Sequence, residues 1–384
     1  MKRHLVQLDS LRGLAALTVV FSHLLYVYPY VEPNTSQNAD FFWLNIVKYS
    51  PLHIFFDGHG AVILFFVLSG FVLALPYYRE SFKLQYIPYI IKRFFRIYVP
   101  YIITLAFAFL LAIPFVGDVV QGSSGFVKRQ WGTEISMQDI LDHVLFIGNS
   151  YDINQFNPVI WSLIHELRIS IIFPFIMMIV LRVNWKYIIC LAVFLSIMVD
   201  LARLDYTIHY TGIFMIGAIL AKHYQTIVHW LKERNTLFKG FLLLLAVCFY
   251  SYSFLFYNTP SAHMYMMDDW FTAIGSVIFI SISLASIRVT NVLKWAPIQY
   301  MGEISYSLYL VHLPIALFMV HLLANLIPTS PILLLSFVLA LLFASLSYHF
   351  IEIPSIKMGA KIARKIKREK SSEFNRNKLA NKNT

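Results

Sequence analysis

Long blocks of hydrophobic residues alternate with short polar connections along the whole chain. Ten blocks are close to the about 20 residues that a helix needs to cross a bilayer; they lie near 9–29, 59–77, 97–116, 160–181, 186–202, 207–223, 238–257, 270–288, 304–325 and 331–351. A transmembrane β-barrel would show segments of about ten residues with alternating hydrophobicity. The pattern therefore predicts an all-α membrane protein with about ten transmembrane helices.

Composition supports this fold class. The 384 residues are 58% hydrophobic and 13% charged, and the charged share is roughly half of the about 25% of a soluble domain. A soluble globular enzyme and a disordered chain are both excluded by these values. The two cysteines, Cys190 and Cys248, exclude a disulfide scaffold and a Cys-rich zinc site.

The basic residues predict the orientation in the membrane. With the N-terminus in the cytoplasm, 25 of the 31 Lys and Arg residues fall in cytoplasmic segments and four fall outside. This asymmetry predicts a multi-pass plasma-membrane protein with both termini in the cytoplasm. The basic excess then faces anionic membrane lipids, and no nucleic-acid partner is expected. Residues 1–355 are expected to form the ten-helix domain, and residues 356–384 a basic cytoplasmic tail that is partly disordered.

Ionisable residues inside the predicted helices are functional candidates, because each costs about 2.5–3.5 kcal/mol at the bilayer centre. Arg12 and His23 are eleven residues apart and share a helix face at about 100° per residue. Glu166 falls at a similar depth to His23, so we expect it to pair with this imidazole and orient it. The alternative is that Arg12 contacts lipid phosphate, and that Glu166 and Arg168 have separate structural partners.

Two further groups of residues have more than one interpretation. Arg93 and Arg96, spaced i,i+3, form a fork that suits phosphate, although they could serve only to set the topology. His312 is either part of a site or a buried histidine with satisfied hydrogen bonds. The segment that contains His53, Asp57 and His59 has metal-ligand residue types, but its spacing matches no standard site, so no metal is expected.

Six sequence blocks resemble, in order, the motifs of the membrane acyltransferase-3 family. They span about residues 5–355 and comprise Arg12 with His23, Phe65 to Phe71, Arg93 to Pro100, Trp161-Ser162-Leu163 with Glu166, Gly302 to His312, and Glu352-Ile353-Pro354. The resemblance implies a ten-helix membrane O-acyltransferase that moves an acyl group, with acetyl expected, from a cytoplasmic donor to a hydroxyl of a cell-envelope glycan or similar acceptor. The family usually has an aromatic pair after the glutamate, whereas Arg168 stands here, which favours a charged acceptor.

Taken together, these observations predict the site. His23, Glu166 and Arg12 are the expected catalytic residues, and Arg12, Arg93 and Arg96 are expected to bind the acyl-CoA donor, with acetyl-CoA as the expected co-substrate and no tightly bound cofactor. The residues expected to shape the site are Ser69, Trp161, Tyr306, Tyr309 and His312. The protein is expected to work alone or with a separate extracytoplasmic partner. The alternatives are a transporter or exporter of glycan or lipid intermediates, and a non-catalytic sensor or scaffold.

Overall fold

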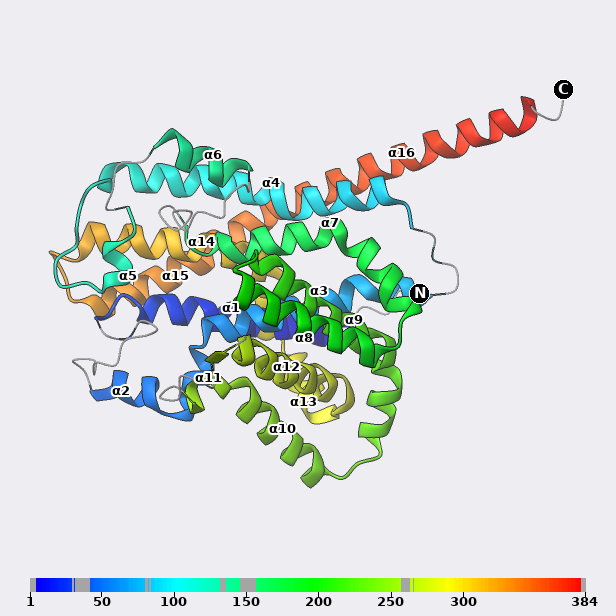
Figure 1. The fold of residues 1–384 in the computed structure, drawn as a ribbon. Coiled ribbons are helices and arrows are strands. Elements are labelled where there is room, and N and C mark those ends of the chain that lie inside the picture. Colours follow the sequence, from blue (N-terminus) through cyan, green and yellow to red (C-terminus); the bar gives the residue numbers. More distant parts are fainter. Residues whose placement is uncertain are drawn as a thin grey trace.

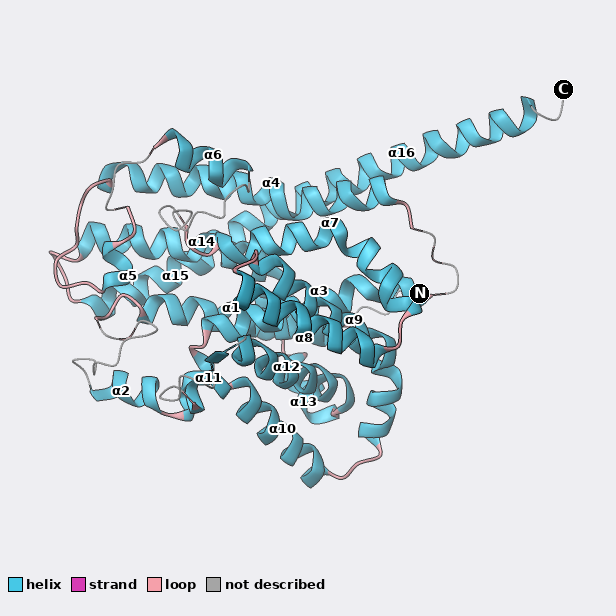
Figure 2. Ribbon diagram, viewed as in Figure 1, coloured by secondary structure: helices cyan, strands magenta, loops and turns pink. Residues whose placement is uncertain are grey.

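The described part of the chain consists of helices and their connections (Figures 1 and 2). The structure is a computed structural model that describes residues 5–380 except 30, 32–41, 80–81, 83, 132–135, 146–156, 257–262 and 265. No strand occurs within these ranges, which confirms the all-α class. The helices are α1 (Val6–Leu25), α2 (Phe42–Tyr49), α3 (Gly58–Ala74), α4 (Tyr86–Ala112), α5 (Gly125–Lys128), α6 (Met137–Leu145), α7 (Ile160–Arg182), α8 (Trp185–Ala202), α9 (Tyr206–Lys232), α10 (Thr236–Tyr250), α11 (Tyr252–Leu255), α12 (Met267–Ala285), α13 (Ile287–Leu293), α14 (Ala296–Leu323), α15 (Thr329–Ser347) and α16 (Ile353–Ala380).

Each of the ten predicted apolar blocks coincides with a helix. Eight helical segments in the described residues are long and apolar enough to cross a membrane, and they contain α1, α3, α4, α7, α8, α12, α14 and α15. The two remaining blocks form α9 and the 15-residue helix α10, which fall outside this set. The protein is therefore a multi-pass membrane protein, while the count of ten and the cytoplasmic position of both termini stay predictions.

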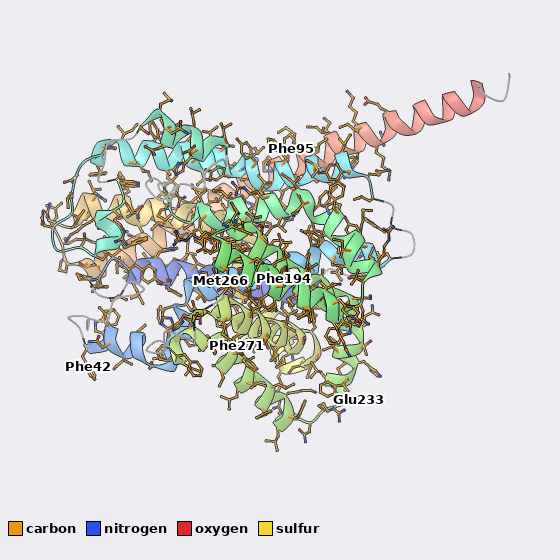
Figure 3. The ribbon with its side chains drawn as sticks, in the orientation of Figure 1. Phe42, Phe95, Phe194, Glu233, Met266 and Phe271 are labelled. Atoms are coloured by element: carbon orange, nitrogen blue, oxygen red, sulfur yellow. The ribbon has the colours of Figure 1, made fainter. Side chains whose placement is uncertain are left out.

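The outward faces of the bundle are apolar, as contact with lipid tails requires. Phe194 on α8 is 55% exposed, and Leu244 on α10 is 61% exposed. Figure 3 labels Phe194 on α8 and Glu233, which lies in a polar connection at the end of α9. In a soluble protein, by contrast, the outward faces of the helices carry mostly polar and charged residues.

Close helix crossings in the core depend on glycine. α1 packs against α14, and α3 packs against α9. A Cβ on Gly13 would meet the backbone of Gly302, and a Cβ on Gly217 would meet the carbonyl of Val67. Small residues allow backbones in membrane bundles to approach closely, which strengthens their packing contacts. These two crossings hold α1, α3, α9 and α14 in the positions that build the site.

The last helix leaves the bundle (Figure 1). The π-helical turn Tyr348–Glu352 joins α15 to α16, which packs against α4 near its own start. A Cβ on Gly359 would meet the ring of Phe95, so this glycine allows the close contact. α16 then continues as one helix through residue 380, into the predicted tail. The boundary near residue 355 and the partial disorder of the tail stay predictions.

Candidate active site

A cavity of about 140 Å³ lies between α1, α3, α4, α7 and α14. Whole drug-sized ligands fill roughly 300–1,000 Å³, so this space suits the reactive end of an extended substrate. The polar residues that line it come from helices far apart in the sequence: Arg12, Ser69, Arg93, Arg96, Ser162, Glu166, Ser305, Tyr306 and Tyr309. Three guanidinium groups and one carboxylate therefore converge on one small space.

The side chain of Arg12 extends from α1 into the cavity and contacts two polar side chains. Its Nη2 lies 2.5 Å from Asp9 Oδ1, and its Nε donates to Ser305 Oγ at 3.2 Å. Asp9 was not among the residues predicted from the sequence, although its i,i+3 spacing from Arg12 places the two side chains on one helix face. Since Ser305 follows Gly302 by one turn, the close crossing of α1 and α14 is what brings this hydroxyl to Arg12.

Glu166 pairs with Arg93 and not with His23, so the predicted His23–Glu166 pair is wrong. Arg93 Nη2 lies 3.5 Å from Glu166 Oε1 and donates to Ser170 Oγ at 2.9 Å. Ser69 Oγ is 3.5 Å from the same carboxylate oxygen. The predicted pair rested on depth in the membrane alone, whereas α1 packs on α3 and α14, and α7 packs on α4 and α9.

The arginines keep unused hydrogen-bonding capacity. Arg93 Nε is buried and has no hydrogen-bond partner among the residues that the structure describes, which is costly unless a ligand or water supplies one. Arg96 lines the cavity, and within the described residues it has neither an ion pair nor a hydrogen bond. Both observations fit an anionic ligand, whose oxygen atoms would accept hydrogen bonds from guanidinium groups.

His23 pairs with His312, and the bonding pattern fixes the tautomers of the neutral pair. His312 Nδ1 lies 3.0 Å from the carbonyl of Leu308, which can only accept, so this nitrogen carries the hydrogen. His312 Nε2 must then accept from His23 Nδ1, 3.0 Å away. The free lone pair therefore lies on His23 Nε2, which is the condition for a base at that atom.

Tyr309 connects the histidine pair to the cavity. Its ring lies 6.1 Å from that of His312, and its hydroxyl contacts Ser162 Oγ at 2.6 Å and donates to the carbonyl of Val159 at 3.0 Å. Tyr306 lines the same space and donates to the carbonyl of Ile97 at 2.6 Å. The two tyrosines, one helical turn apart, thus form the α14 wall of the cavity.

Two other residues from the sequence analysis, Trp161 and Arg168, are near in sequence to residues that line the cavity. Trp161 stands one residue before Ser162 and stacks on His59 with ring centroids 5.8 Å apart. Arg168 pairs with Asp205 at 3.1 Å, so its charge is already offset, which weakens the argument for a charged acceptor. Burial favours the neutral form of Asp205, but hydrogen bonds from Thr207 and the charge of Arg168 outweigh it and lower the pKa of this carboxyl.

Glu352 lies near the arginines of the cavity, although it was not among the site residues expected from the sequence. Its buried side chain accepts from Ser307 Oγ at 2.7 Å and lies within electrostatic range of Arg96 and Arg12. The signal was present, since the Glu-Ile-Pro block was one of the six that carried the resemblance. Its position beside the arginines depends on the turn between α15 and α16.

The three residues considered for metal binding have separate partners. His53 stacks on Phe254, Asp57 caps α3 by accepting from Gly60 N, and His59 pairs with Asp269. In the described ranges, no three His, Cys, Asp or Glu side chains converge as metal ligands. The expectation of a metal-free site stays a prediction.

Comparison with known proteins gives one family. Residues 5–349 match the family model described as an acyltransferase domain. The chain is also 25% identical over 397 residues to the protein named "Putative peptidoglycan O-acetyltransferase YrhL" of Bacillus subtilis (strain 168), and the alignment covers 93% of this chain. It covers 56% of the relative, so the chain spans about half of that protein's length. No solved structure matches. The family match covers most of the chain and includes every helix that lines the cavity. The chain therefore belongs to the acyltransferase-3 family of multi-pass membrane proteins.

Proposed function

We propose that this protein is an O-acyltransferase of the plasma membrane, which moves an acyl group, with acetyl expected, from cytoplasmic acyl-CoA to a hydroxyl of a cell-envelope glycan. The observation that carries the proposal is the cavity in which Arg12, Arg93 and Arg96 converge with Glu166, next to the His23–His312 pair. A fixed cationic cluster beside a histidine with a free lone pair supplies what acyl transfer from an anionic thioester needs.

The donor would bind on the arginine side of the cavity. Arg93 and Arg96 lie in the cytoplasmic half of α4 by the predicted topology, which is the side from which acyl-CoA arrives. Their guanidinium groups would hold its phosphates, and the narrow space between Ser69 and Tyr309 would take the thioester end. Glu166 and Asp9 would keep Arg93 and Arg12 in place, because each carboxylate contacts one guanidinium.

The acceptor hydroxyl would be activated by His23. Its Nε2 would take the hydroxyl proton, and the oxygen would attack the thioester carbon, so that the thiol leaves as CoA and the proton returns to it. His312 would act as a positioning residue, since it accepts from His23 Nδ1 and thereby keeps the lone pair on Nε2. Tyr309 stands between the pair and the cavity and would shape the path of the acyl group.

The acceptor class rests on the family and on the name of the relative. That protein is named for O-acetylation of peptidoglycan, and the aligned part is about half of it. We therefore propose a glycan acceptor of this kind, reached alone or with a separate extracytoplasmic partner. Membrane lipids surround the helices, and neither nucleic acid nor a tightly bound cofactor is part of the proposal.

The test is acetyl transfer by the purified protein. Detergent-solubilised protein is incubated with radiolabelled acetyl-CoA and peptidoglycan fragments, and label is followed into the glycan. His23→Gln should reduce turnover by about 10²–10⁴-fold, because Gln can hydrogen-bond but takes no proton at neutral pH. His312→Phe should also reduce it, because His23 then loses the acceptor that orients it.

The matched control is His321→Gln, on the same helix as His312. His321 is also buried and its Nδ1 also donates to a backbone carbonyl, that of Leu317, but its ring packs against Trp131. This variant should transfer acetyl normally. Near-normal turnover in His23→Gln would show that the histidine is structural and would favour the transporter alternative. Absence of transfer by the unmodified protein with every glycan tried would contradict the proposed function.

A further inference from the structure

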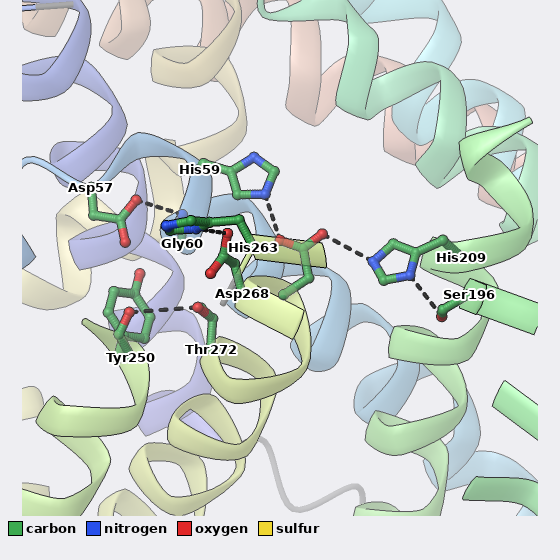
Figure 4. Close-up of polar contacts among 10 residues, drawn as sticks. Asp57, His59, Gly60, Ser196, His209, Tyr250, His263, Asp268 and Thr272 are labelled. Atoms are coloured by element: carbon green, nitrogen blue, oxygen red, sulfur yellow. Dashed lines mark hydrogen bonds and ion pairs between the residues drawn. The ribbon is translucent and has the colours of Figure 1, made fainter. Parts of the chain in front are cut away.

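A second chain of polar contacts joins four helices outside the cavity (Figure 4). His59 Nε2 on α3 lies 2.6 Å from Asp269 Oδ1 on α12, and Asp269 Oδ2 lies 2.9 Å from His209 Nε2 on α9. His209 Nδ1 in turn lies 2.8 Å from Ser196 Oγ on α8. His59, His209 and Asp269 lie near the starts of their helices, and Ser196 lies in the second half of α8. The predicted topology places these parts of the helices toward the extracytoplasmic side of the membrane.

This chain of contacts is buried at the His209 end and accessible at the His59 end. The side chains of His209 and Asp269 are 0% and 6% exposed, whereas that of His59 is 52% exposed. A carboxylate buried between two imidazoles needs its hydrogen bonds, because an unpaired buried charge is strongly destabilising. The buried part therefore holds an accessible imidazole in a defined orientation.

The hydrogen bonds also determine what His59 presents. Because a carboxylate only accepts, the hydrogen of His59 lies on Nε2, which donates to Asp269. Nδ1 then carries the lone pair, and Figure 4 shows the second nitrogen of the ring turned away from the carboxylate. Within the part of the chain that the structure describes, Nδ1 has no hydrogen-bond partner. Nδ1 can accept from a hydroxyl, or donate to one when the ring is protonated.

His59 lies at the outer end of the site. Val62 lines the cavity, and His59 precedes it by three residues, one turn further out on the same face of α3. Its ring stacks on Trp161, the neighbour of the cavity residue Ser162. A Cβ on Gly58 would lie 2.8 Å from Ser22 Oγ, so the first turn of α3 is level with His23 on α1.

We propose that His59 binds a hydroxyl group of the glycan acceptor through Nδ1, and that Asp269 and His209 act through it as positioning residues. The proposal rests on the proposed function, since it names a residue that holds the acceptor for the transfer. It assigns His23 and His59 different roles at one depth: His23 takes the proton, and His59 holds the acceptor. The competing explanation is that these polar contacts only stabilise the packing of the four helices against one another.

A neighbouring histidine–carboxylate pair offers the matched control. His263 Nδ1 lies 2.8 Å from Asp268 Oδ2, one residue from Asp269 on α12, and His263 Nε2 lies 2.9 Å from the carbonyl of Phe256. Both ring nitrogens are thus engaged within the protein. Asp268→Asn removes a carboxylate charge from the same helical turn and leaves the hydrogen bond between His59 and Asp269 in place.

The experiment separates acceptor binding from donor binding. Initial rates are measured with varied peptidoglycan fragments at saturating acetyl-CoA, and then with the roles reversed. His59→Gln should raise the acceptor KM by about 3–10-fold, the usual range for one lost hydrogen bond, and leave the donor KM unchanged. Asp269→Asn should do the same, because the imidazole loses its ionic anchor. Asp268→Asn should change neither constant.

A double-mutant cycle tests whether Asp269 acts through His59. If it does, Asp269→Asn should add no further increase in the acceptor KM once His59 is Gln. Equal and additive effects, or an unchanged acceptor KM in His59→Gln, would overturn the proposal. A loss of thermal stability alone, without a change in the acceptor KM, would show that these polar contacts only stabilise the packing of the four helices.

Direct binding keeps the proposal testable if transfer fails. Binding of the same peptidoglycan fragments is measured by calorimetry with acetyl-CoA absent. Binding that weakens in His59→Gln but not in Asp268→Asn would support the acceptor subsite even if the unmodified protein transferred nothing, in which case only the proposed function fails. Equal binding by all three proteins, or none, would overturn the subsite.

Discussion

At the scale of single residues, the three cavity arginines differ in whether a carboxylate offsets their charge. Arg12 contacts Asp9, and Arg93 contacts Glu166, whereas Arg96 is exposed and has no ion pair with any described residue. A guanidinium with a carboxylate partner is fixed in place but partly neutralised, while one without a partner offers its full charge to a ligand. Arg96 is therefore the group most available to an incoming phosphate.

This difference predicts two distinct outcomes of alanine substitution. Arg96→Ala should raise the KM for acyl-CoA by about 10–100-fold, since a hydrogen bond to a charged group contributes about 1.5–3 kcal/mol, and leave thermal stability unchanged. Arg93→Ala should raise the same KM and also lower the melting temperature, because Glu166 would lose its ionic partner. Kinetics with varied donor and a thermal melt measure both quantities.

Arg182→Ala is the control, because Arg182 ends α7 and is not among the residues that line the cavity. It should leave the donor KM and the melting temperature as they are. An unchanged KM in both cavity variants would mean that these arginines serve the topology alone.

At the scale of elements, one glycine contact sets the distance between α1, which carries Arg12 and His23, and α14, which carries their partners Ser305 and His312. Gly13 on α1 faces Gly302 on α14, and a Cβ at either position would meet the backbone of the other helix. Arg12 with Ser305 and His23 with His312 are contacts across this same crossing. The separation of the two backbones therefore determines both of these contacts.

Gly13→Ala should consequently impair both the fold and the chemistry. Overpacking typically costs about 1–3 kcal/mol, so we expect a lower melting temperature in detergent together with a loss of acetyl transfer. Gly240→Ala is the control, because a Cβ at Gly240 on α10 has nothing within 4 Å. Alanine is the better helix former by roughly 1 kcal/mol, so this variant should be as stable as the parent or more so. Equal melting temperatures for the two variants would contradict the role of the crossing.

At the scale of the whole molecule, the orientation in the membrane stays a prediction from the distribution of basic residues. By this prediction, 25 of the 31 Lys and Arg residues lie on the cytoplasmic side. Positive charge is retained on the cytoplasmic side during insertion. Both chain ends are therefore expected in the cytoplasm.

Cysteine labelling tests the orientation in intact cells. Cys190 and Cys248 are exposed in the structure, so both are first replaced by Ala. A cysteine at Ser371, in the predicted tail, should react with an impermeant thiol reagent only after the cells are opened. A cysteine at Met137, 69% exposed on α6, should react from outside. The opposite pattern would reverse the orientation.

The sequence by itself determined the fold class and the positions of the helices, and it singled out several of the residues that line the cavity, among them Arg12, Arg93 and Glu166. Hydrophobic blocks marked α1 and α14 without ambiguity, because burial in lipid demands long apolar helices whatever their neighbours are. The cost of charge in a membrane likewise singled out Arg12, His23 and Glu166, since that cost depends on depth and not on which helices are neighbours.

Only the tertiary structure decided which of these residues meet. His23 was expected beside Glu166 because both lie at one depth, yet it contacts His312, and Glu166 contacts Arg93. The contacts of His59 and Glu352 could not be read from the sequence either, since their partners Asp269 and Ser307 lie far away in the sequence. The physical reason is that hydropathy and helical periodicity specify depth and facing along one helix, whereas the choice of neighbouring helices depends on close contacts such as that of Gly13 with Gly302.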